Sequence, residues 1–181
     1  RMISDVPLGA FLSGGIDSST IVSYMCRIRP PETNKTFSIG FKEATYDESS
    51  FASRVADSLK VPHFVEFCSN RTKDELSKIA YFADEPFADT SIIPMYYLAK
   101  MAKKHVTVCL SGDGADENLA GYETYVADKI CRLTNFLPSW MVRTFGEMMV
   151  WLVPASYDKV GMDYKIRKFF AGHSFDVFKA H

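Results

Sequence analysis

The stretch that decides the fold runs from Leu8 to Ser19 and reads Leu-Gly-Ala-Phe-Leu-Ser-Gly-Gly-Ile-Asp-Ser-Ser. Its first five residues are mostly apolar, its two adjacent glycines permit a tight turn, and apolar residues then recur at helical spacing from Ile21 to Ile28. This order predicts a buried strand, a glycine turn and an amphipathic helix. A helix N-terminus directs free N–H groups and the positive end of its dipole at the preceding turn, so the stretch predicts a phosphate-binding loop.

The polar residues of this loop support that interpretation. Ser13, Ser18 and Ser19 supply hydroxyl donors, and the glycines let a polyanion approach the backbone. Asp17 makes sense beside phosphate mainly when a divalent cation lies between them. The structural alternative is a serine-capped helix that follows a glycine turn and binds nothing.

Two better-known phosphate motifs are absent from the sequence. No G-x-x-x-x-G-K-[ST] occurs, and the glycines of Ser-Gly-Asp-Gly at 111–114 do not complete G-x-G-x-x-G, because Glu117 stands where the third glycine belongs. The segment at 13–19 is therefore a different kind of nucleotide loop.

A second polar loop, Ser-Gly-Asp-Gly-Ala-Asp-Glu, occupies residues 111–117 directly after an apolar run. It carries three carboxylates, which repel one another unless a cation or a proton relieves them. If the first and fourth strands are neighbours, Asp17 and Asp116 approach each other and offer two oxygen ligands to Mg²⁺. The alternative is an acidic helix N-terminus that is solvated and stabilised by the helix dipole.

Strand and helix patterns alternate along the chain. Further strands are expected at 36–41, 62–67 and 106–110 and helices at 73–83 and through 96–101. Another helix begins near Asp47, the expected N-cap, and has one apolar face made of Phe51, Ala52, Val55, Ala56 and Leu59. The alternation predicts an α/β fold with a parallel sheet, whose ligands bind at the carboxyl ends of the strands. Strand signals stop near residue 125, so we expect a nucleotide-binding core at 1–124 and a helical extension at 125–181.

Composition excludes several classes of function. The 181 residues, 47% of them hydrophobic, are enough for one sizeable core, and the net charge of −1 without a basic run gives no attraction to nucleic acid. No segment is long enough to cross a membrane. The four cysteines lie far apart and form no metal-ligand pair, and three of them sit inside apolar patterns, which predicts buried free thiols in a reducing compartment, the cytoplasm. The chain opens on Arg1 and soon enters a core strand, as expected of a piece of something longer.

At this point the sequence resembles the synthetase domain of the glutamine-dependent asparagine synthetase family. The loop at 13–19 resembles the pyrophosphate-binding loop (PP-loop) of the wider ATP pyrophosphatase group, and the segments at 36–41, 84–89, 111–117 and 120–122 are similar to motifs of this family in particular. The resemblance covers about residues 4–135 well and the remainder weakly. It implies a Rossmann-like sheet flanked by helices, of the adenine nucleotide alpha hydrolase type.

The resemblance also implies roles for individual residues. Leu12 and Ile39 match positions whose backbone flanks adenine, and Ser111 and Gly112 match a pair that contacts the nucleotide from the opposite loop. Asp113 matches the position that assists acyl-adenylate formation, where asparagine synthetases usually carry Glu. The magnesium carboxylates correspond to Asp17 and Asp116, and the pyrophosphate cradle corresponds to Ser13, Gly14, Gly15, Asp17, Ser18 and Ser19.

The implied activity is ATP-dependent, AMP-forming amide synthesis with Mg²⁺, in which ammonia from glutamine converts an activated acid, aspartate by default, to an amide. The family's N-terminal glutaminase domain has no counterpart in this sequence. Members of the family also carry a lysine well after the second loop, and Lys165, Arg167 and Lys168 are candidates for it by charge alone. The implied partners are small molecules, the glutaminase domain and, in a homodimer, a second copy of the chain.

Three other functions stay open at this stage. One is a related synthetase, amidotransferase or cyclising, that acts on a different acid. Another is tRNA or purine modification, which the missing basic patch disfavours. The third is a non-catalytic nucleotide-binding module, and magnesium dependence of ATP binding distinguishes it from an enzyme.

Overall fold

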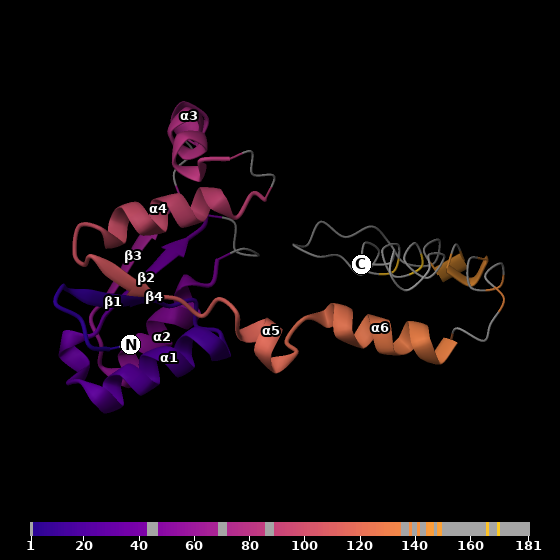
Figure 1. The fold of residues 1–181 in the computed structure, drawn as a ribbon, viewed down its shortest axis with the longest axis horizontal. Helices are drawn as coiled ribbons and strands as arrows, with labels where there is room; N and C mark the ends of the chain where they lie inside the picture. The colour runs from indigo at the N-terminus through magenta and orange to yellow at the C-terminus, as the bar shows by residue number, and fades with distance from the viewer. Residues whose placement is uncertain are drawn as a thin grey trace. The chain divides into compact units, whose positions relative to one another are not determined.

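A computed structural model describes residues 2–42, 47–68, 72–85, 89–134, 138, 141, 144–146, 148–149, 166 and 170 (Figure 1). The chain divides into two compact units, Arg1–Asp113 and Gly114–His181. Each unit is described by itself below.

The first unit is built on a parallel sheet with the strand order β3-β2-β1-β4. β1 lies in the middle of this order and pairs with β2 on one side, where Ala10 is opposite Thr36, and with β4 on the other, where Ala10 is opposite Leu110. The first and fourth strands are therefore neighbours, which was the condition set for the two polar loops to meet. The strands are β1 (Leu8–Phe11), β2 (Lys35–Gly40), β3 (His63–Phe67) and β4 (Val108–Leu110).

Helices cover both faces of this sheet, as the α/β pattern predicts (Figure 1). α1 and α2 pack on one face and α4 packs on the other, while α3 lies against α4. The helices of the first unit are α1 (Ile16–Ile28), α2 (Ser49–Leu59), α3 (Thr72–Ala83) and α4 (Ile92–Ala102), with a 3₁₀ turn, η1, at Pro31–Thr33.

Two apolar clusters form the core, one on each face of the sheet. Alternate residues of the first strand segment, Leu8, Ala10 and Leu12, point to the face that carries α1 and α2. They pack there with buried residues that include Val22 of α1 and Ala52 of α2. On the other face Phe37, which is fully buried, packs with Leu98, Met101, Ala102 and Val106. The sheet therefore packs between helices on both faces, and its strands lead directly into the loops.

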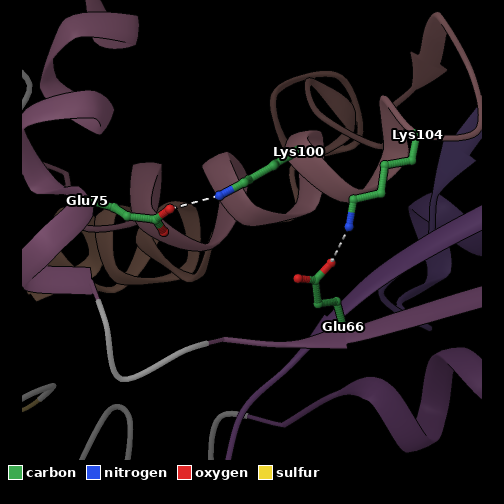
Figure 2. Close-up of polar contacts among 4 residues, drawn as sticks. All are labelled: Glu66, Glu75, Lys100 and Lys104. Atoms are coloured by element: carbon green, nitrogen blue, oxygen red, sulfur yellow. Dashed lines mark hydrogen bonds and ion pairs between the residues drawn. The ribbon is translucent and has the colours of Figure 1, made fainter.

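Two ion pairs join elements on the α4 side of the sheet (Figure 2). Lys100 of α4 lies 2.8 Å from Glu75 of α3, and Lys104 lies 3.9 Å from Glu66 of β3. The Lys100 ammonium lowers the pKa of Glu75, and Glu75 in turn raises the pKa of Lys100. Such exposed pairs contribute little to the stability of the fold.

Several expected features differ from the observed ones, besides shifts of a few residues at other element ends. The fourth strand begins at Val108 rather than at residue 106, and it forms an edge of the sheet. α2 begins at Ser49, and Phe51, expected on its inward face, is 54% exposed. The four cysteines, all among the described residues, form no disulfide, as expected, but they are half-buried rather than buried.

The second unit begins with α5 (Ala115–Leu119) and α6 (Glu123–Thr134). α6 spans residue 125, where the helical extension was expected to begin. Most of that expected extension after residue 134 lies outside the described residues, as do Lys165, Arg167 and Lys168. Within the described ranges, no helix combines the length and the apolar character that a membrane crossing requires.

One histidine joins two strands and makes stability depend on pH. Nδ1 of His63 lies 2.9 Å from Thr36 Oγ1, and its Nε2 lies 3.0 Å from Ser38 Oγ. Burial lowers the pKa of His63, because the imidazolium form loses hydration there. The unfolded chain therefore binds a proton more readily than the folded chain, and the stabilisation by neutral His63 is lost as the pH falls below about 6.5.

We expect the free energy of unfolding to fall between about pH 7.5 and about pH 5.5, and to fall less in a His63→Gln variant, which has no titrating ring. Urea denaturation at the two pH values measures both slopes. Equal slopes for the two proteins would show that His63 is not the titrating group.

Candidate functional site

The loop after β1 is held in shape by its own serine hydroxyls. The backbone N–H of Ser13 donates to Ser18 Oγ at 3.2 Å, and the two serine hydroxyls lie 3.0 Å apart. The N–H of Gly15 donates to Ser13 Oγ at 3.2 Å. Ser18 is buried in this network, at the start of α1. Hydrogen bonds inside the segment 13–18 therefore hold the loop in shape.

Gly14 occupies a position that only glycine suits. Its φ is +83°, in the region that L side chains rarely adopt. A Cβ at Gly14 would lie 2.6 Å from the carbonyl carbon of Phe51 and 2.7 Å from the backbone nitrogen of Ala52. The backbone of α2 thus passes directly beside the loop, and it leaves no room for a side chain.

The N-terminus of α1 offers groups that suit an anion. Its first N–H groups have no acceptor inside the helix, and they point into the loop. Ser19 Oγ is buried and has no hydrogen-bond partner among the described residues, so a ligand oxygen would satisfy it. Asp17 stands half-buried in the first turn of the same helix.

The loop after β4 reaches the same helix end. A Cβ at Gly112 would lie 3.1 Å from the backbone nitrogen of Ser18 and 3.4 Å from Asp17 Cβ. Ser111 Oγ donates to Asp113 Oδ2 at 2.6 Å, and the N–H of Asp113 donates back to Ser111 Oγ at 3.3 Å. Because β1 and β4 pair in parallel, both loops leave the sheet at the same edge. The structure therefore brings residues 111–113 beside the N-terminus of α1.

The two residues expected to flank adenine lie on adjacent strand ends. Leu12 is buried, and its N–H donates to the carbonyl oxygen of Phe37 at 2.9 Å. Ile39 lies two residues further along β2 and is half-buried. Both positions are thus at the carboxyl edge of the sheet, on the same side as the two loops.

The other two carboxylates of the second loop, Asp116 and Glu117, belong to the second unit. Asp116 is in the first turn of α5, and a Cβ at Gly121 would collide with its Oδ1. Tyr122 donates its hydroxyl to Glu117 Oε1 at 2.5 Å, which lowers the pKa of Glu117 and raises the pKa of Tyr122 to about 12. No group of three or more His, Cys, Asp or Glu side chains among the described residues is arranged to hold a metal ion.

Sequence reasoning missed the part that α2 plays. A hollow of about 320 Å³ lies beside Gly14 and is lined by Phe51, Arg54, Val55 and Ser58 of α2. The guanidinium of Arg54 lies 4.6 Å from the centre of the Phe51 ring. The one signal in the sequence was an apolar face that includes Phe51, and that pattern is equally typical of core packing.

Comparison with known proteins agrees with this geometry. The model of the family described as asparagine synthase matches residues 1–165. The chain belongs to the asparagine synthase family. Its sheet, its glycine loop and its Ser-Gly-Asp-Gly loop therefore form part of an asparagine synthase domain.

Several curated proteins are similar to this asparagine synthase domain. A putative asparagine synthetase [glutamine-hydrolyzing] 2 of Methanocaldococcus jannaschii is 47% identical over 142 residues, which are 76% of this chain and 27% of that protein. Asparagine synthetase [glutamine-hydrolyzing] 1 of Bacillus subtilis is 48% identical over 126 residues, 69% of this chain and 20% of that protein. An amidase, chry2, of Gibberella zeae is 26% identical over 159 residues, 80% of this chain and 24% of that protein. The chain thus spans a quarter or so of the length of these relatives.

The approach of Gly112 to α1 predicts a graded effect of side-chain size. We expect Gly112→Ala to lower the free energy of unfolding slightly and Gly112→Val to lower it by about 1–3 kcal/mol, because the added methyl groups meet the backbone of Ser18. Urea denaturation of the three proteins measures this order. A Gly112→Val variant as stable as wild type would contradict the close approach of the two loops.

Proposed function

We propose that the full-length protein catalyses ATP-dependent, AMP-forming amide synthesis. The observation that carries the proposal is the approach of Gly112 to the N-terminus of α1, which sets two polar loops at one edge of the sheet. Membership of the asparagine synthase family supports ATP-dependent amide synthesis in general. The substrates, the residue roles and the partners below are part of the proposal.

ATP lies across the carboxyl edge of the sheet in this proposal. The backbone at Leu12 and Ile39 flanks the adenine, and Ser111 and Gly112 contact the nucleotide from the other loop. The pyrophosphate end lies in the loop formed by Ser13, Gly14, Gly15, Asp17, Ser18 and Ser19. The unpartnered Ser19 hydroxyl and the free N–H groups of α1 fit phosphate oxygens there.

Asp17 and Asp116 would hold Mg²⁺, since carboxylate oxygens suit this ion and phosphate and water complete its octahedron. When bound, the ion neutralises charge on the phosphates. The half-buried position of Asp17 in the first turn of α1, beside the phosphate loop, fits this role.

The reaction has two steps that balance in atoms and charge. An oxygen of the substrate carboxylate attacks the α-phosphorus of ATP, the bond to the β-phosphate oxygen breaks, and an acyl-adenylate and pyrophosphate result. Ammonia then attacks the acyl carbon, AMP leaves with the bonding electron pair, and a proton is released to give the amide. The N–H groups at the N-terminus of α1 stabilise the charge that develops on the departing pyrophosphate.

Asp113 is the catalytic residue in this proposal and bears on the choice of acid. Its carboxylate is oriented by the Ser111 hydroxyl, 2.6 Å away, and it assists formation of the acyl-adenylate. Aspartate, giving asparagine, is the default substrate. Asp is one methylene shorter than the Glu usual in asparagine synthetases, so a different acid is the second candidate.

The proposal extends to the rest of the full-length protein. We expect an N-terminal glutaminase domain to supply ammonia, as the glutamine-hydrolysing names of the relatives suggest, and a homodimer is possible. A cytoplasmic location is consistent with four cysteines that form no disulfide. The division into a nucleotide core at 1–124 and a helical extension at 125–181 stays a prediction.

ATP–pyrophosphate exchange by the full-length protein tests the proposal. With Mg²⁺ present and ammonia absent, we expect labelled pyrophosphate to enter ATP only when the right acid is supplied, with aspartate tested first within a panel of carboxylic acids. An Asp113→Asn variant is expected to exchange at least about tenfold more slowly while still binding ATP. If none of the acids in the panel supports exchange, and ATP binds equally well with and without Mg²⁺, a non-catalytic nucleotide-binding module would be favoured.

A further inference from the structure

The carboxylate of Asp47, outside the proposed site, accepts hydrogen bonds from the backbone of two different segments. Oδ1 of Asp47 accepts the N–H of Phe41 at 3.3 Å and the N–H of Ser49 at 3.1 Å. Phe41 directly follows β2, and Ser49 is the first residue of α2. The same oxygen therefore fastens the end of a strand to the start of a helix.

The start of α2 is the surface against which the phosphate loop rests. A Cβ on Gly14 would lie 2.6 Å from the carbonyl carbon of Phe51 and 2.7 Å from the backbone nitrogen of Ala52. Two bonds extend the first turn of this helix, because the N–H groups of Phe51 and Ala52 both donate to the carbonyl oxygen of Glu48, at 3.0 and 3.1 Å. Any fraying of this turn moves the backbone that faces Gly14.

The end of β2 is the other segment that Asp47 holds. Ile39, whose backbone we place beside adenine, lies two residues before Phe41. The intervening Gly40 has its carbonyl oxygen fixed by the N–H of Cys68 at 2.8 Å. The Asp47 bond to Phe41 thus secures the strand end that supports Ile39.

We propose that Asp47 is a positioning residue that holds the adenine side and the phosphate side of the nucleotide site at a fixed separation. It does so through β2 on one side and through the first turn of α2, which supports Gly14, on the other. The inference rests on the proposed function for the identity of the ligand. The geometry of the support is given by the hydrogen bonds of Asp47 and by the contact between α2 and Gly14.

The chemistry of the carboxylate suits this role. The Ser49 hydroxyl and N–H beside Asp47 hold the pKa of its carboxyl below the usual range, so it stays ionised. An ionised carboxylate at a helix start also interacts favourably with the helix dipole. Among the described residues, the N–H groups of Phe41 and Ser49 and the Ser49 hydroxyl lie beside this carboxylate, and its hydrogen bonds hold the backbone at these two segments.

Two measurements on the full-length protein test the inference. The first is hydrogen–deuterium exchange without ligand, followed in peptides that cover residues 12–19 and 47–56. The second is the dissociation constant of Mg–ATP by calorimetry. Asp47→Ala removes the acceptor, and Asp47→Asn keeps the Oδ1 acceptor. Asp57→Ala is the matched control, because it removes a carboxylate from the other end of α2.

Asp47→Ala is expected to exchange faster in both peptides and to bind Mg–ATP about tenfold more weakly, the effect of losing one helix-start interaction. Asp47→Asn should restore affinity to within about twofold of wild type, and Asp57→Ala should leave residues 12–19 unchanged. If Asp47→Ala does not fold, Asp47→Glu serves instead, since it keeps the charge but moves the oxygen by one methylene. It is expected to bind Mg–ATP more weakly than Asp47→Asn.

A specific pattern would overturn the inference. In Asp47→Ala, hydrogen–deuterium exchange would be faster at residues 47–56 alone. The exchange rate at residues 12–19 and the dissociation constant of Mg–ATP would both stay within about twofold of wild type. A wild-type protein that binds no ATP would contradict the proposed function instead. The exchange at 12–19 would then still decide whether Asp47 supports the loop.

Discussion

The Gly14→Ala variant of the full-length protein is expected to bind Mg–ATP at least about a hundredfold more weakly than wild type. A non-glycine residue in this left-handed conformation costs about 1–2 kcal/mol, and overlap with the backbone of Phe51 and Ala52 costs about 1–3 kcal/mol more. The α2 backbone cannot move aside as a flexible side chain does, so the loop itself must shift. Calorimetric titration with Mg–ATP measures the loss.

Gly114→Ala is the control for this variant. Gly114 has a φ of +85°, almost equal to that of Gly14, but a Cβ there would have nothing within 4 Å. We expect the control to lose about 1–2 kcal/mol of stability, with a much smaller effect on ATP affinity. A Gly14→Ala variant that binds Mg–ATP as wild type does would remove the loop from the proposed site.

The second large effect is expected from the two proposed magnesium ligands. Asp17→Asn and Asp116→Asn should each weaken Mg–ATP binding by about thirtyfold or more, because each removes a charged oxygen ligand from the same ion. Since both carboxylates are proposed to bind one ion, the affinity of the double variant for Mg–ATP should be at most about threefold lower than that of the single variant with the lower affinity. Calorimetry with and without Mg²⁺ measures the cycle, and the four proteins should differ little when the metal is absent.

Glu117→Gln is the matched control for Asp116. Its carboxylate accepts the hydroxyl of Tyr122 at 2.5 Å and is proposed to take no part in metal binding. We expect its affinity for Mg–ATP to stay within about threefold of wild type. Losses that multiply fully in the Asp17 and Asp116 double variant would place the two carboxylates at separate sites.

The part of the fold that could be predicted from the sequence is the part written in local patterns. An apolar run, two glycines and a helical face identify β1, its loop and α1, and strand–helix alternation predicts the parallel sheet. The pairing of β1 with β4 was expected only as a condition, and the structure supplies it. The close approach of Gly112 to Ser18 follows from that pairing, not from any motif.

The part that could not be predicted depends on contacts between elements far apart in the chain. Phe51 reads as a core residue by its spacing on α2, yet it is 54% exposed, because its backbone rather than its ring meets Gly14. Asp47 was expected as the N-cap of α2, but the N-cap is Glu48, and Asp47 lies one residue before it, where its Oδ1 accepts the N–H of Ser49. Its second bond, to Phe41 at the end of β2, has no signature in local sequence.

Isotope transfer from the acid substrate tests the central claim most directly. The full-length protein is incubated with ATP, Mg²⁺, ammonia and an acid labelled with oxygen-18 in its carboxylate, and the AMP is examined by mass spectrometry. An acyl-adenylate intermediate predicts that each AMP formed carries one labelled oxygen, since the carboxylate oxygen stays on the α-phosphorus when ammonia displaces AMP. Unlabelled AMP, or ADP with labelled phosphate, would contradict the account.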